Sequence, residues 1–107
     1  MAHYYDEVYD IVRSIPKGRV SSYGAISAFL SLGSARMVGW ALNQLKGTKH
    51  KVPAHRVVNS QGILSGANNF VGSPGMRGLL EKEGVEVRNN RVLNFDEIFW
   101  DPSKEIL

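Results

Sequence analysis

The sequence predicts a small, mainly α-helical domain with one or two short β-hairpins, close to a winged helix. Three observations indicate this fold class. Apolar residues recur at helical spacing near the N-terminus, two short helical segments follow with a glycine between them, and apolar and polar residues alternate around an asparagine turn near residue 90. With 107 residues, we expect one domain built around a single core.

The first helix is expected over residues 4–15. Its apolar residues recur at helical spacing, with charged residues between them, so that one face can be buried; they are Tyr5, Val8, Tyr9, Val12 and Ile15. Pro16 and Gly18 end this helix, and residues 19–21 are expected to form a short extended connection.

Two further helices are expected before residue 47. Ser22 can cap the second, which runs to about Leu32, and Gly33 then makes a turn. Ser34 can cap the third, which ends at Gly47. Two short helices joined by a tight turn form a helix-turn-helix unit.

The segment 53–58 places an imidazole and a guanidinium, His55 and Arg56, in an otherwise apolar run that follows a proline. We expect a buried extended segment in which other polar groups partner these two side chains. Residues 59–62 have turn composition, and residues 63–65 are expected to return as a short strand.

The last third of the chain begins with a segment rich in glycine and asparagine, residues 66–78, which predicts a surface loop. Residues 79–83 are expected to end a helix at Gly84. Residues 85–87 and 92–93 are expected to pair across a turn with positive φ at asparagine. A final apolar cluster contains Phe95, Ile98, Phe99 and Trp100.

Composition excludes several classes of protein. The 107 residues include no cysteine, which rules out disulfides, zinc fingers, iron–sulfur ligation and thiol catalysis. The net charge of +3 and pI of about 9.4 permit nucleic-acid binding without requiring it. The three histidines lack metal-ligand spacing and no phosphate-loop motif is present, so no cofactor or metal is expected.

Membrane insertion and secretion are not expected either. No apolar run approaches the roughly 20 residues that span a bilayer. The N-terminus is neither basic nor apolar enough for a signal peptide, so we expect an intracellular protein.

Four ordered blocks resemble one known family. They read IPKGRVSSYG at 15–24, SARMVG at 34–39, PAHRVV at 53–58 and LLEKEGV at 79–85. These blocks are similar to those of the O6-alkylguanine-DNA alkyltransferases, whose active-site segment reads Pro-Cys-His-Arg-Val. Ala54 occupies the cysteine position. The chain therefore resembles the alkyltransferase-like proteins, which keep the lesion-binding apparatus without the nucleophile, and no enzymatic activity is expected.

The resemblance implies a DNA-binding helix in the minor groove of duplex DNA and a damaged nucleotide rotated out of the stack. Arg36 matches the residue that fills the resulting gap, and Tyr23 matches the tyrosine that presses on the flanking phosphate. Ser34, Ala35 and Gly39 belong to the same recognition helix, on which Gly39 and Ala41 are small where the helix face approaches sugar and phosphate. Without the resemblance, Arg36 is a solvated charge, Tyr23 a core residue, and Gly39 with Ala41 a site of tight helix packing.

Basic residues elsewhere have two interpretations. Each is a possible phosphate contact and, singly, more often a solubilising charge; they are Lys17, Arg19, Lys46, Lys49 and Lys51.

The resemblance also assigns the surroundings of Ala54. His55 and Glu83 match the pair that activates the cysteine through a water, and here they form a remnant with Ala54. Arg56 and Pro53 are expected to have structural roles, Arg56 by bonding backbone carbonyls or Glu83. A lesion pocket is expected to be lined by Ala54, Val57, Phe70 and Tyr23.

Some positions depart from the family pattern. The asparagine that follows the recognition helix falls at Leu45, with Asn43 two positions away. The segment 66–70 lacks the serine-tyrosine pattern of the transferases and the arginine that some alkyltransferase-like proteins carry near Ala67.

Three functions remain open from the sequence. The leading one is a monomeric damage sensor that binds duplex DNA containing O6-alkylguanine and recruits nucleotide-excision repair proteins. The second is a water-dependent dealkylase using His55 and Glu83. The third is a winged-helix regulator that reads intact DNA, against which the expected exposure of Met37 and Trp40 on the third helix argues.

Overall fold

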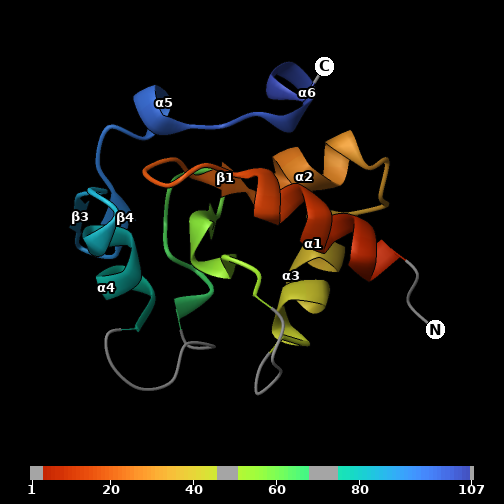
Figure 1. Ribbon diagram of the computed structural model, residues 1–107, viewed down its shortest axis with the longest axis horizontal. Coiled ribbons are helices and arrows are strands. Elements are labelled where there is room, and N and C mark those ends of the chain that lie inside the picture. The colour runs from red at the N-terminus through yellow and green to blue at the C-terminus, as the bar shows by residue number, and fades with distance from the viewer. Residues whose placement is uncertain (1–3, 46–50, 68–74, 107) are drawn as a thin grey trace.

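The computed structural model describes residues 4–45, 51–67 and 75–106 (Figure 1). The helices are α1 (Tyr4–Ser14), α2 (Tyr23–Phe29), α3 (Ala35–Asn43), the 3-10 helix η1 (Ala54–Arg56), α4 (Gly75–Lys82), α5 (Phe95–Ile98) and α6 (Pro102–Glu105). The strands are β1 (Ser21–Ser22), β2 (Val57–Val58), β3 (Val87–Arg88) and β4 (Arg91–Val92). The predicted mainly helical class with short strand pairs is confirmed.

Two hydrophobic clusters form the core, and the short β1–β2 pair lies between them. β1 and β2 are parallel, with Ser21 opposite Val57 and Ser22 opposite Val58. Because successive residues of a strand point to opposite faces, Val57 packs with α1, α2 and α3, whereas Val58 packs with α4 and the β3–β4 pair. Figure 1 shows these two groups of elements on opposite sides of the molecule.

Helix α1 is held against α3 by packing and by two tyrosine hydroxyls. Tyr9 donates to the carbonyl oxygen of Ala41 at 2.7 Å, and Tyr4 donates to that of Met37 at 3.0 Å. Ala41 is 0% exposed in the core beneath these helices. The suggestion that Ala41 approaches DNA is therefore wrong, and its small size serves helix packing.

The turn between α2 and α3 differs from the prediction. Helix α2 ends at Phe29 rather than near Leu32, because Ser31 adopts a left-handed conformation with φ of 57°. Gly33 is not among the glycines with positive φ. A serine in the left-handed region ends the helix two residues before the glycine that the sequence suggested. Helix α3 ends at Asn43, ahead of Gly47, which lies outside the described residues.

Three other expectations need correction. Residues 54–56 form a 3-10 helix that follows Pro53, so the extended segment begins only at Val57. Helix α4 begins at Gly75, whose φ is +71°, and the expected loop to residue 78 is therefore too long. In place of a strand over 63–65, Ile63 makes an isolated bridge to Arg91.

The C-terminal hairpin forms with the turn that its sequence predicted. Asn89 and Asn90 both have positive φ, 52° and 62°. The pairing joins Val87 to Val92 and Arg88 to Arg91, one or two positions away from the expected strands. This hairpin lies beside α4 and closes the hydrophobic cluster that contains Val58 and Leu80.

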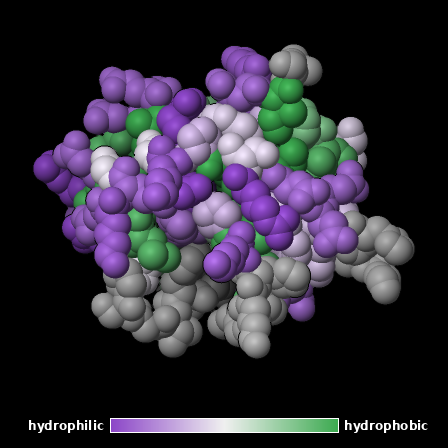
Figure 2. Space-filling view, viewed as in Figure 1, coloured by the Kyte–Doolittle hydropathy of each residue, from purple (hydrophilic) through white to green (hydrophobic). Residues whose placement is uncertain are grey.

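The surface is predominantly polar. On the face in Figure 2, hydrophobic residues form separate groups between hydrophilic ones. Across the described ranges, only Trp40 and Ile106 are large hydrophobic residues classed as exposed, at 53% and 41%. None of the helices in these ranges has both the length and the apolar character needed to cross a bilayer.

The two helix caps make matched predictions for stability. The Ser22 hydroxyl accepts a hydrogen bond from the Ala25 amide at 3.0 Å, whereas the Ser34 side chain makes no cap bond. Ser22→Ala should therefore lower the free energy of unfolding by about 1 kcal/mol, and Ser34→Ala by no more than a few tenths. Urea denaturation of both variants measures this, and equal losses would contradict the capping difference.

Candidate nucleic-acid interface

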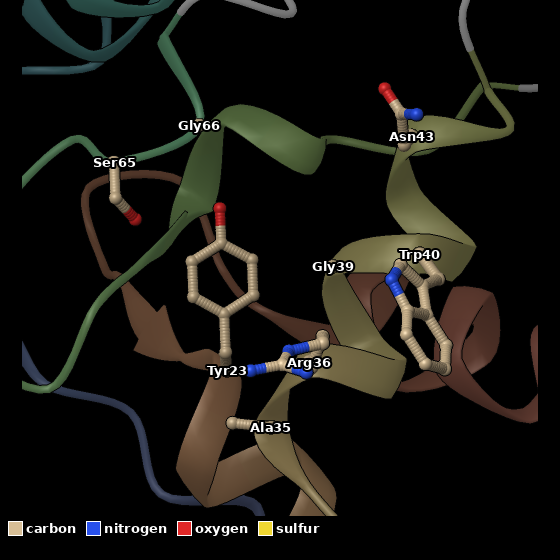
Figure 3. Close-up of a pocket in the computed structure, with 8 residues that line it drawn as sticks. All are labelled: Tyr23, Ala35, Arg36, Gly39, Trp40, Asn43, Ser65 and Gly66. Carbon is tan, nitrogen blue, oxygen red and sulfur yellow. The ribbon is translucent and has the colours of Figure 1, made fainter.

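A pocket of about 500 Å³ lies against the outward face of α3. Four residues of α3 in its lining have the spacing i, i+3, i+4 and i+7, which places them on one face of the helix: Arg36, Gly39, Trp40 and Asn43. Ser65 and Gly66 form the opposite wall, and Tyr23 stands between (Figure 3). The full lining is Tyr23, Ala35, Arg36, Gly39, Trp40, Asn43, Ser65 and Gly66.

Arg36 provides the cationic group of this pocket. It lies exposed in the first turn of α3, next to the exposed Ser34 and Ala35. In the described part of the chain, its guanidinium has no hydrogen-bond or ion-pair partner. A permanently charged planar group without a protein partner is available for a nucleic-acid base or phosphate.

Gly39 keeps the middle of the pocket open. A Cβ atom placed on this residue would have no neighbouring atom within 4 Å. Helix packing therefore does not require glycine here, in contrast to the buried Ala41. The missing side chain instead leaves space between Tyr23 and Trp40 (Figure 3).

Tyr23 is positioned by the start of α2, directly after the β1–β2 pair. Burial raises the pKa of its hydroxyl above 10.0, although hydrogen bonding to Ser65 opposes part of that increase. The hydroxyl is therefore protonated at neutral pH and can donate. Its tip lies so close to Gly66 that a Cβ on Gly66 would come within 2.6 Å of the hydroxyl oxygen.

The Glu83 carboxylate, directly after α4, holds η1 and, through Arg56, the residue that follows α1. Arg56 donates to both of its oxygens, from Nε to Oε1 at 2.9 Å and from Nη2 to Oε2 at 2.6 Å. Arg56 Nη1 also donates to the Ile15 carbonyl oxygen at 2.8 Å, at the end of α1. His55 Nε2 lies 2.9 Å from Glu83 Oε2. Pro53 lies directly before η1.

Charge stabilises the ionised form of Glu83. Burial alone raises the pKa of Glu83, but hydrogen bonds from Arg56 and His55 and their positive charges outweigh it, lowering the pKa from 4.5 to about 2. Because an ionised carboxylate only accepts, His55 Nε2 carries the proton of this hydrogen bond.

The predicted lesion pocket is only partly recovered. Tyr23 lines the pocket of Figure 3, whereas Ala54, partly buried in η1, is not among its lining residues. Val57 is 0% exposed, because it faces the core beneath α1. The prediction that Val57 lines a ligand pocket is therefore wrong. Phe70 lies outside the described residues.

The basic residues have different environments. Arg19 donates to the carbonyl oxygens of Ile98 and Phe99 at 2.9 and 2.7 Å, so it holds the C-terminal segment and is not free for phosphate. Lys17 and Lys51 are exposed. Lys51 lines a second pocket, of about 410 Å³, with Arg13, Val52, Pro53, His55 and Arg56. Lys46 and Lys49 lie outside the described residues.

Four residues of the pocket were not predicted from the sequence: Trp40, Asn43, Ser65 and Gly66. The spacing of Trp40 and Asn43 from Arg36, four and seven residues, could have placed both on its helix face. Asn43 is exposed at the pocket, while Leu45 packs partly buried against the core. No local pattern indicates Ser65 and Gly66, since their position depends on the fold. Nowhere in the described ranges do three histidine, aspartate or glutamate side chains gather as a metal site.

Comparison with known proteins identifies the class of protein that combines this fold and site. Residues 3–85 match the model of the 6-O-methylguanine DNA methyltransferase DNA-binding domain, and the chain belongs to this family. Within the family it is similar to alkyltransferase-like protein 1 of Schizosaccharomyces pombe, with 40% identity over 95% of this chain and 98% of that protein. It is also 36% identical to a DNA base-flipping protein of Vibrio parahaemolyticus, over 90% and 94% of the two chains.

A solved structure supports the same assignment. The crystal structure of S. pombe Atl1 in complex with damaged DNA containing O6-carboxymethylguanine has a TM-score of 0.78 to this chain, at 35% identity. The superposition covers 95% of this chain and 98% of that one. The predicted family and its helix-turn-helix fold are thereby confirmed.

The ion pair between Arg56 and Glu83 predicts how the stability of the protein depends on pH. Glu83→Gln should lower the free energy of unfolding at pH 7 by about 3 kcal/mol, because Arg56 loses its buried counter-charge. Since the pKa of Glu83 is lowered on folding, the wild-type protein should lose this contribution as the pH falls from about 4.5 towards about 2. The difference between the two proteins should shrink over that range.

Urea denaturation between pH 7 and pH 2 measures this difference. Glu81→Gln is the matched control, because Glu81 makes only an exposed pair with Arg77 on the same helix and should cost under about 0.5 kcal/mol. A gap between wild type and Glu83→Gln that is constant with pH would contradict the assigned ionisation.

Proposed function

We propose that this protein is a DNA damage sensor. It binds duplex DNA through the minor groove, flips O6-alkylguanine into a pocket, holds it without dealkylation and flags it for nucleotide-excision repair. It acts as a monomer. The observation that carries the proposal is the open pocket of about 500 Å³ against α3 with the solvent-facing Arg36 at its edge.

The face of α3 that lines this pocket suits contact with duplex DNA, because it carries the exposed guanidinium of Arg36 and the small Gly39. The extruded base is expected beside Ala54, which is partly buried in η1 and does not line this pocket. Extruding a nucleotide costs a few kcal/mol and is easiest where alkylation has already weakened the base pair. The Arg36 guanidinium can stack in the vacated position and face the phosphates with its charge. Ser34, Ala35 and Gly39 bring the start of α3 close to the backbone, and Tyr23 contacts the flanking phosphate.

The lesion would be held without repair because the sequence has no cysteine to act as the nucleophile. Alkyl transfer in the family uses a cysteine, and the 107 residues of this sequence include none. Ala54, at the cysteine position, offers only a methyl group. A protein that retains a lesion in this way needs others to remove it, which is the role given to nucleotide-excision repair proteins. The relatives named for base flipping and solved with damaged DNA support the same assignment.

The water-dependent dealkylase is less well supported. Both oxygens of Glu83 are engaged by Arg56, and its pKa of about 2 makes it a poor base at neutral pH. Displacement at a saturated carbon would then depend on His55 alone, without a metal or a strong nucleophile.

The regulator alternative has one favourable observation. Besides Trp40, the exposed positions of α3 include Arg36 and Asn43, which can hydrogen-bond to base edges, and the exposed Gln44 follows directly after the helix. Met37 is half-buried. Selection of a defined motif from random undamaged duplexes would favour that function over damage sensing.

Binding to matched duplexes tests the sensor directly. A fluorescently labelled duplex containing one O6-methylguanine should bind more tightly than the same duplex with guanine, and affinity for both should fall with salt. Arg36→Ala should remove most of the preference, because the extruded state loses its stacking cation.

The control for this experiment is Arg88→Ala, which removes the same charge from the exposed β3–β4 hairpin and should leave the ratio of the two affinities unchanged. Equal affinity of the wild type for both duplexes would refute lesion recognition. An unchanged ratio in Arg36→Ala would show that another residue fills the gap.

Mass spectrometry of the DNA tests whether chemistry occurs. After incubation with excess protein, the O6-methylguanine oligonucleotide should keep its methyl group and the protein should keep its mass. Loss of the methyl group from the DNA with an unmodified protein would favour the water-dependent dealkylase.

A further inference from the structure

Trp40 is placed unusually for a tryptophan. The residue is 53% exposed, although large aromatic residues are normally well buried. The other tryptophan of the chain, Trp100, shows the usual pattern, at 5% exposure in the hydrophobic cluster that also contains Val57. Exposing an indole forgoes the favourable burial of its apolar surface, so fold stability does not account for this position.

The indole of Trp40 has no bonding partner within the described part of the protein. Among those residues, no aromatic ring packs against it and no acceptor receives its N–H group. An indole N–H donates and does not accept. A ligand that covers Trp40 should therefore present a hydrogen-bond acceptor next to an apolar surface.

The minor groove of duplex DNA offers this combination. Its base edges present mainly acceptors, and proteins that bind there commonly insert apolar side chains. Its walls are deoxyribose rings, which turn C–H groups towards the groove. The exposed guanidinium of Arg36, one helical turn before Trp40, adds the positive charge that a polyanion attracts. These features favour DNA over a protein as the partner of this indole.

The position of Trp40 on α3 indicates which strand it meets. In Figure 3 the Tyr23 and Trp40 rings lie on either side of Gly39, and all three residues line the same pocket. A helix with its side chains is about 10–12 Å wide and the minor groove about 6 Å, so the groove must open around α3 and both walls must contact it. The two walls belong to opposite strands. With Tyr23 on the phosphate beside the lesion, the wall left for Trp40 is that of the complementary strand.

We infer that Trp40 packs against the deoxyribose wall of the complementary strand and holds α3 in the minor groove. The inference rests on the proposed function and adds a duplex-binding residue to it. Arg36 and Tyr23 act where the nucleotide leaves the stack, whereas Trp40 contacts a strand that carries no lesion. Trp40 therefore contributes affinity for damaged and undamaged duplexes alike, and Arg36 provides the preference between them.

Substitution with matched controls tests this inference. Trp40→Ala should weaken binding to the O6-methylguanine duplex and to the guanine duplex by the same factor, about tenfold, because an apolar contact and a hydrogen bond are lost together. The slope of log affinity against log salt should stay unchanged, since a neutral contact releases no counterions. Trp40→Phe keeps an apolar ring and should recover part of the affinity. Ile106→Ala, which removes the other exposed large hydrophobic side chain of the described ranges, should have no effect.

Hydroxyl-radical footprinting identifies the strand that Trp40 covers. These radicals cleave DNA by attacking deoxyribose hydrogens that line the minor groove, so a packed indole protects the sugars beneath it. The unsubstituted protein should protect both strands near the lesion. Trp40→Ala, at a concentration that saturates the duplex, should lose protection on the complementary strand and keep it on the damaged strand.

The outcomes separate the inference from the proposed function. Unchanged affinity of Trp40→Ala for both duplexes, or an unchanged footprint on the complementary strand, would overturn the role of Trp40 and leave damage sensing intact. A loss of affinity confined to the damaged duplex would also overturn it, since the contact would then be with the extruded nucleotide. Equal affinity of the wild type for both duplexes would refute the proposed function itself.

Discussion

The buried contact between Arg56 and Glu83 is the interaction on which the arrangement of this protein depends. Arg56 reaches the end of α1 through the Ile15 carbonyl, and Glu83 follows α4, so one ion pair ties both halves of the core to the segment that follows Pro53. That segment continues into β2, which pairs with β1 and so positions the start of α2 with Tyr23. Without its counter-charge, the guanidinium would be buried at a cost of several kcal/mol.

The contact with Arg56 also gives Glu83 a structural role that is independent of catalysis. The resemblance matches His55 and Glu83 to the pair that activates a thiol in the alkyltransferases. In this chain Glu83 also forms the buried ion pair with Arg56. Replacing a cysteine by alanine leaves that ion pair unchanged, whereas replacing Glu83 would disturb both hydrophobic clusters. Glu83 therefore has a structural role in its contact with Arg56 that does not depend on a nucleophile at position 54.

The sequence predicted the fold class because its patterns are local: helical spacing in α1, the Ser22 cap and the two asparagines of the hairpin all act within a few residues. It missed features decided by tertiary contacts. The left-handed Ser31 replaced Gly33 as the helix terminator, and Val57 turned inward because both faces of β2 are covered. The pocket wall at Ser65 and Gly66 comes from a segment distant in sequence from α3, which no local pattern could indicate.

The close approach of Tyr23 to Gly66 links these two positions of the chain. A methyl group at residue 66 would collide with the phenolic oxygen at 2.6 Å but would meet the ring carbon beneath it at 4.0 Å, an ordinary contact distance. A side chain at residue 66 therefore requires either loss of the phenolic oxygen or a shift of the ring. The identity of residue 66 and the position of the Tyr23 ring are coupled in this way.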